Sequence, residues 1–154
     1  MGKRREGREA AVQFLYQLDL NGQELTVGSL EFWSLRCAPG TTPPAKTQAY
    51  TKELVDGVCS RLTEIDEHIK RLAANYELNR LAAVDRNILR LAIYEMLFCP
   101  DIAPVIAINE AIEIAKRFGA EKSGGFVNGI LDRVKGELNR PAREALAPPP
   151  ERQS

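Results

Sequence analysis

Apolar residues recur along most of this chain at three- and four-residue intervals, the spacing that places them on one face of an α-helix. The strongest case is the segment VDRNILRLAIYEMLF, residues 84–98, which is apolar on most of its circumference. A helix that is apolar nearly all round is typical of the centre of a bundle. We therefore expect the stretch from Val84 to Val134 to organise the fold, with two further helices following this hub helix.

The same spacing predicts an all-α protein of about seven helices with short connections, and no segment shows the alternating pattern of a β-strand. Thr63 to Asp66 has the signature of a helix N-cap and is expected to start the fourth helix. The expected helices cover residues 3–20, 25–36, 48–62, 63–75, 84–98, 108–118 and 127–138, the last with Phe126 at its first turn. The residues expected in the core include Trp33, Ile88, Leu91, Ile93, Leu97, Ile108, Ile112, Ile130 and Leu131.

Proline and glycine mark where the helices stop. Residues 37–47 hold three prolines and a glycine, which predicts a loop. Gly119 stands where a C′ glycine should end the sixth helix, and residues 121–125 are expected to form the turn to the seventh. Residues 139–154 are rich in proline, alanine, arginine, glutamate and glutamine, so we expect a disordered tail.

Composition narrows the class of protein. The chain has 154 residues, 44% hydrophobic and 27% charged, with a formal net charge of zero, so nucleic-acid binding would need a local basic patch. No apolar run approaches the roughly 20 residues of a membrane span, and the charged N-terminus lacks a signal-peptide core. A soluble, cytoplasmic protein is expected. Three widely spaced cysteines and one histidine, without a CxxC pair, predict no disulfide framework, metal site or cofactor.

Catalytic motifs are missing from the sequence. The only histidine, His68, has no serine or cysteine beside it to activate, and it is expected at the surface. Gly124 and Gly125 follow no strand and match no phosphate-binding loop. Glu110 and Glu113 are interpreted as part of a solvated helix face. The remaining classes are nucleic-acid binding and protein–protein adaptor proteins, without enzymatic activity.

Cations gather at the start of the first helix. Arg4, Arg5 and Arg8 fan out along one flank of its apolar stripe, with Tyr16 continuing that flank and Lys3 on the other side. The helix macrodipole disfavours cations at an N-terminus, so a binding partner for these side chains is worth considering. The alternative is an ordinary solvated helix start. Arg86 and Arg90, in contrast, are expected on the narrow polar strip of the hub helix.

Four segments resemble the NusB family of bacterial transcription antitermination factors. They are REAAVQFLYQ, VDRNILRLAIYEM, AINEAIEIAKRFG and FVNGILDRV. The resemblance covers roughly residues 3–138 and is absent from the loop at 37–47 and from the tail. It implies a single domain of two packed helical bundles, with helices one to three in residues 3–62 and helices four to seven in residues 63–138.

The resemblance also implies a function. Family members pair with NusE, a protein of the small ribosomal subunit, and the pair binds the boxA element of nascent ribosomal RNA leader transcripts. The complex then joins other Nus factors on RNA polymerase and suppresses termination. By motif position, Tyr16 and Asp85 would face NusE. The residues that would meet RNA are Lys3, Arg4, Arg5, Arg8, Lys122, Ser123 and Phe126.

One departure from the family pattern concerns Gly124 and Gly125, which stand where relatives can carry larger polar or basic side chains. The turn before the last helix then offers fewer side-chain donors to RNA. Two alternatives to the antitermination function remain. One is an RNA-targeting module that works with a separate methyltransferase chain; the other is a helical protein–protein scaffold without an RNA role. A homodimer that hides the RNA face is also possible in this family.

Overall fold

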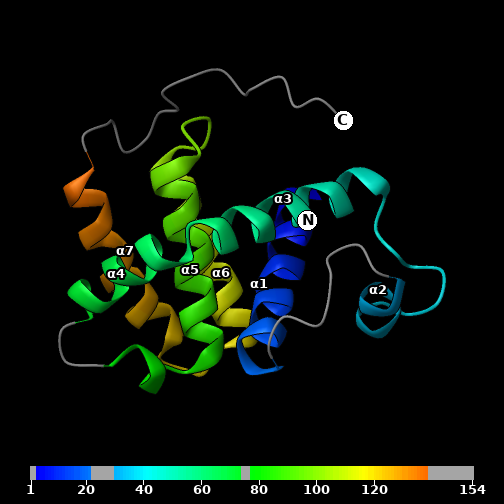
Figure 1. The fold of residues 1–154 in the computed structure, drawn as a ribbon, viewed down its shortest axis with the longest axis horizontal. Helices are drawn as coiled ribbons and strands as arrows, with labels where there is room; N and C mark the ends of the chain where they lie inside the picture. The colour runs from blue at the N-terminus through cyan, green and yellow to red at the C-terminus, as the bar shows by residue number, and fades with distance from the viewer. Residues whose placement is uncertain (1–2, 22–29, 74–76, 139–154) are drawn as a thin grey trace. The chain divides into compact units, whose positions relative to one another are not determined.

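The computed structural model describes residues 3–21, 30–73 and 77–138, and all regular structure in these ranges is helical (Figure 1). This confirms the all-α prediction. Chain contacts divide the protein between Ser60 and Arg61 into two compact units, unit 1 before the division and unit 2 after it. The helices are α1 Lys3–Asn21, α2 Leu30–Arg36, α3 Ala45–Ser60, α4 Leu62–Leu72, the 3-10 turn η1 Leu78–Arg80, α5 Ala83–Phe98, α6 Pro104–Phe118 and α7 Ser123–Glu137.

In unit 1, α1 and α3 pack along each other, and Gly7 lies at a close contact between them. A Cβ atom at Gly7 would lie 2.7 Å from Cδ2 of Tyr50 on α3. The Thr51 hydroxyl lies 3.1 Å from the carbonyl oxygens of both Gly7 and Thr47, so a buried hydrogen bond joins the two helices. The missing side chain of Gly7 therefore allows α3 to reach the backbone of α1.

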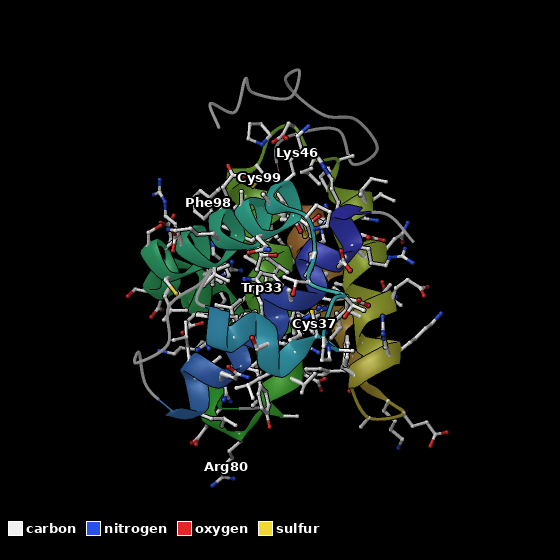
Figure 2. All side chains as sticks on the ribbon, turned by 90° about the vertical axis from the view of Figure 1, so that its right-hand side faces the viewer. Trp33, Cys37, Lys46, Arg80, Phe98 and Cys99 are labelled. Atoms are coloured by element: carbon white, nitrogen blue, oxygen red, sulfur yellow. The ribbon has the colours of Figure 1, made fainter. Side chains whose placement is uncertain are left out.

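Aromatic contacts attach α2 to α1. The Phe32 ring meets Phe14 edge to face at a centroid distance of 4.7 Å, and it meets Trp33 at 5.0 Å. Arg36 Nε donates to Gln13 Oε1 at 2.7 Å. Trp33, labelled in Figure 2, is only 1% exposed, which confirms its place in the core. Residues 25–29 of the predicted second helix lie outside the described residues, as does the tail.

In unit 2, α5 packs against α4, α6 and α7, which confirms it as the hub helix (Figure 1). Most of the residues expected in the core are buried there. Leu97 and Ile112 are half-buried instead, so the prediction was wrong in placing them in the core. The confirmed core residues of this unit are Ile88, Leu91, Ile93, Ile108, Ile130 and Leu131.

The structure corrects several helix starts. The loop ends earlier than expected, because α3 begins at Ala45, and Gly40 within it has a φ of 81°. The fourth helix begins at Leu62 after Arg61, without a side-chain cap, so Thr63 is helical rather than the N-cap. The last helix begins at Ser123, which puts Gly124 and Gly125 inside its first turn.

The polar strip on which Arg86 and Arg90 were expected is itself buried, since the two residues are 9% and 8% exposed. Arg90 donates from Nε and Nη2 to the two carboxylate oxygens of Asp66 on α4, at 2.8 and 3.0 Å. Arg86 Nη1 donates to the carbonyl oxygens of Leu78 and Leu81 at 3.0 Å. A guanidinium has five donors, and burial is tolerated here because these partners satisfy several of them.

A surface ion pair joins α4 to α7. Arg71 Nη2 donates to Glu137 Oε1 at 2.8 Å and lies 3.0 Å from Nδ1 of His68, which is half-exposed. The hydrogen bond from Arg71 lowers the pKa of the Glu137 carboxyl below its ordinary value of 4.5. Nearby, Arg133 Nη1 donates to the Leu72 carbonyl at the end of α4. None of the described helices is long and apolar enough to cross a membrane.

Candidate nucleic-acid interface

The N-terminal arginines of unit 1 differ in accessibility. Arg4 is exposed and Arg5 is half-buried, whereas Arg8 is only 3% exposed. Lys3 belongs to the first turn of α1, but its side chain lies outside the described set. Of the predicted RNA contacts on α1, Arg4 is thus the most exposed, Arg5 is partly accessible, and Arg8 has little surface to offer a ligand.

Packing on Tyr50 orients Arg4. Its guanidinium carbon lies 5.6 Å from the centroid of the Tyr50 ring, a cation–π distance. Such stacking covers one face of the planar guanidinium and leaves its N–H edge free to approach a phosphate. The neighbouring turn of α1 is also the place where Gly7 brings α3 close. The contact between α1 and α3 therefore helps to hold Arg4 in place.

In unit 2, a tight corner between α6 and α7 carries the other predicted RNA contacts. The backbone N–H of Ala120 donates to Ser123 Oγ at 2.9 Å, and the N–H of Ser123 donates back to the Ala120 carbonyl at 3.0 Å. A Cβ at Gly119 would lie 2.7 Å from Ser123 Oγ and 2.8 Å from the Ala115 carbonyl oxygen. Two hydrogen bonds between Ala120 and Ser123 thus hold the corner, and position 119 has space only for glycine.

That geometry changes the interpretation of two residues. Gly119 ends α6 with φ −92° and ψ −177°, an extended conformation, so its role is close approach rather than a left-handed C-cap. Ser123 is 3% exposed and its hydroxyl is engaged inside the corner. A direct side-chain contact of Ser123 with RNA stays a prediction, and its observed contacts indicate a structural role that sequence reasoning missed.

Lys122 and Phe126 remain as accessible side chains of the corner. Lys122 is exposed at the N-cap position of α7, and Phe126 is half-buried one turn later. Residues four apart lie on the same face of a helix, so the cation and the aromatic ring share one flank of α7. This pairing suits an unpaired nucleotide, because a ring can stack on its base while a cation meets its phosphate.

The predicted partner-facing residues, Tyr16 and Asp85, are both half-buried and belong to different units. Asp85 lies in the first turn of α5, and its Oδ1 atom is buried without a hydrogen-bond partner in the described structure. A buried acceptor of this kind carries a free-energy cost until a donor reaches it.

Arg86 is the residue of this region that sequence reasoning missed. Its hydrogen bonds to Leu78 and Leu81 fix the connector that leads into α5 and so position Asp85. The sequence signal for this role was the four-residue spacing of Arg86 and Arg90 on an otherwise apolar helix. Among the described residues, no group of three or more metal-binding side chains occurs.

Comparisons with known proteins give a consistent result. A model of the NusB family matches residues 5–135. The transcription antitermination protein NusB of Myxococcus xanthus is 46% identical over 142 residues, covering 92% of this chain and 100% of that protein. The NusB of Sorangium cellulosum is 41% identical, covering 94% of this chain and 99% of that protein. These relatives are named for transcription antitermination, which confirms a regulatory protein rather than an enzyme.

Solved structures agree. The structure of T. maritima NusB has a TM-score of 0.75 and 40% identity, covering 89% of this chain and 93% of that one. A structure of the antitermination factors NusB and NusE in complex with dsRNA has a TM-score of 0.73 and 28% identity. The match covers 88% of this chain and 98% of that one. The likeness extends over nearly the whole of each related chain.

Proposed function

This chain belongs to the NusB family, and on that premise we propose that it is an RNA-binding transcription antitermination adaptor. With NusE it binds boxA of nascent ribosomal RNA transcripts in the cytoplasm and helps to assemble the antitermination complex on RNA polymerase. The observation that carries the proposal is the similarity to a NusB–NusE complex with RNA over 88% of this chain. The proposal treats residues 1–138 as one NusB-like domain.

We assign the RNA contacts to two surfaces. On α1, Arg4 and Arg5, with Lys3 in the same turn, bind phosphates, which supply affinity without sequence information. At the α6–α7 corner, Lys122 contributes a further cation and Phe126 a stacking ring. Ser123 maintains the shape of the corner through its hydrogen bonds with Ala120. Arg8 is 3% exposed and is assigned no phosphate contact.

We assign the protein partner to Tyr16 and Asp85. A tyrosine offers rigid, amphipathic contact area of the kind enriched at interfaces. The unpartnered Oδ1 of Asp85 would gain a donor from NusE, which would remove the cost of its burial. Arg86 acts as a positioning residue by holding the start of α5.

The test removes two accessible cations from α1. We expect Arg4→Ala with Arg5→Ala to weaken binding of the protein–NusE pair to single-stranded boxA RNA and to reduce the salt slope by about 1.5, the loss of two phosphate contacts. Fluorescence anisotropy at several salt concentrations measures both quantities.

The matched control removes two exposed cations from unit 2, Lys70 and Arg80, each in a weak surface ion pair. Figure 2 shows Arg80 extending away from the ribbon. Equal affinity and equal salt slope in the Arg4–Arg5 variant and the wild type would refute the α1 surface. Failure of the wild-type pair to bind any RNA would favour a scaffold without an RNA role.

A further inference from the structure

A groove of about 440 Å³ opens in unit 2 beside the α6–α7 corner. One wall comes from the last turns of α6, the floor from the first turn of α7, and the rim from the connecting turn. Its volume lies in the lower part of the range for small-molecule sites, roughly 300–1,000 Å³. The residues that matter for its chemistry are Ile112, Lys116, Glu121, Gly124, Gly125 and Asn128.

The floor exists because two consecutive residues lack side chains. A Cβ at Gly125 would meet nothing within 4 Å, and a Cβ at Gly124 would make ordinary contacts of 3.9 Å with Ile112 and Lys116. Neither glycine has a positive φ. Unlike Gly119, they are not required by packing or backbone conformation, although glycine within a helix costs up to about 1 kcal/mol relative to alanine. Their effect is to leave the backbone of α7 open to a ligand.

The groove lies on a different flank of α7 from Lys122 and Phe126. At about 100° per residue, Gly124 and Asn128 project roughly 200° away from those two side chains, whereas Gly125 projects about 60° from Lys122 and about 100° from Phe126, toward open space. The buried residues Val127 and Leu131 occupy the face between the flanks. A ligand in the groove therefore makes contacts additional to those at Lys122 and Phe126.

The lining has the chemistry of a nucleotide site. Ile112 and the aliphatic stem of Lys116 form an apolar wall beside a flat glycine floor, which fits the face of a base. The ammonium of Lys116 is held only by a 3.6 Å ion pair with Glu113, both side chains being about half exposed or more, so it is available to a phosphate. The segment from Lys116 to Lys122 holds three cations and one anion, which favours a polyanionic partner.

We propose that this groove receives one unpaired nucleotide of the bound RNA, an inference that rests on the RNA-binding function proposed above. The base lies on Gly124 and Gly125 against the α6 wall, and Lys116 meets its phosphate. Asn128 and Glu121 read the base edge, where the carboxylate accepts from an exocyclic amino group. A base with an exocyclic amino group, which is cytosine, adenine or guanine, is therefore preferred to uracil at this position.

The experiment fills the groove and compares a matched position on the same helix. Gly125→Leu places a side chain in the groove, whereas Gly136→Leu places it near the end of α7, outside the groove and away from Lys122 and Phe126. Both glycines are exposed and both Cβ positions have open space, so the two changes are alike for folding. Binding of single-stranded boxA RNA by the full chain with NusE is measured by anisotropy. We expect Gly125→Leu to weaken binding about tenfold, the loss of one bound base, and Gly136→Leu to bind like the wild type.

A second measurement identifies the nucleotide. Abasic replacement along the RNA should find one position that weakens wild-type binding but has little further effect on the Gly125→Leu protein. For a variant with minimal risk of misfolding, Gly124→Ala with Gly125→Ala raises the floor by two methyl groups, and Gly129→Ala with Gly136→Ala is its control. The first pair should weaken RNA binding and the second should not.

Each contrary result has a distinct meaning. If the wild type binds RNA and both groove variants bind equally well, the groove proposal is overturned while the proposed function stands. If the wild-type pair binds no RNA, both fail. If Gly125→Leu loses NusE in an RNA-free pull-down and Gly136→Leu does not, the groove is a protein-docking site and the nucleotide proposal is wrong.

Discussion

Single missing Cβ atoms have opposite consequences along this chain. A Cβ atom added at Gly119 would lie less than 3 Å from the Ala115 carbonyl oxygen and from the Ser123 side chain. A Cβ atom added at Gly129 would meet open space. The sequence predicted glycine at 119 as a helix terminator. It could not show that the requirement is steric, because the partner atoms come from the next helix as well as from its own.

We therefore expect alanine at these two glycines to change stability in opposite directions. Gly119→Ala should lower the free energy of unfolding by about 1–3 kcal/mol, the usual cost of overpacking. Gly129→Ala should raise it by up to about 1 kcal/mol through helix propensity. Urea denaturation followed by circular dichroism measures both. Equal effects of the two changes would show that the corner tolerates a methyl group at Gly119.

At the scale of helices, periodicity predicted the elements well and their starts poorly. The hub helix α5 has a strong apolar pattern, and the structure places it at the centre of unit 2. The starts of α3, α4 and α7 differ from those that the local capping and glycine signals predicted, because such signals do not contain the contacts made in the folded chain. The same limit explains Arg86 and Arg90, whose partners lie on α4 and in the connector before α5.

The Arg90–Asp66 contact provides a test of this helix pairing. Both side chains are largely buried, at 10% and 14% exposure, so removing either partner leaves the other charge poorly solvated. We expect Arg90→Ala and Asp66→Ala each to destabilise unit 2 by about 3–5 kcal/mol. The double variant should cost much less than the sum of the two. Additive losses in a denaturation cycle would show that the pair contributes little coupling.

For the whole molecule, the fold class follows from the sequence and the functional surfaces follow from family resemblance. Zero net charge and the lack of catalytic motifs narrowed the function to binding. No pattern within the chain, however, distinguishes Tyr16 or Asp85 from other half-buried residues. Among the predicted RNA contacts, burial distinguished the more accessible Arg4 and Arg5 from the buried Arg8, and the exposed Lys122 from the buried Ser123. Helical spacing near a terminus does not provide this distinction.

The partner surface is testable on the intact protein. We expect Tyr16→Asp to weaken NusE binding at least about tenfold, because a charge would enter the desolvated part of the interface. Gln17→Asp adds the same charge at the next half-buried residue of α1 and should have a smaller effect. Isothermal titration with NusE measures both affinities. Unchanged affinity of the Tyr16 variant, with its helical content intact, would place the interface elsewhere.

The position of Trp33 has a spectroscopic consequence. It is the one tryptophan of the chain, and its indole is 1% exposed beside the Phe32 ring in unit 1. Its emission therefore reports the loosening of unit 1, while the far-ultraviolet dichroism of the helices reports both units. Coincident melting curves from the two signals would mean that the units unfold together, and separated curves would assign a stability to each.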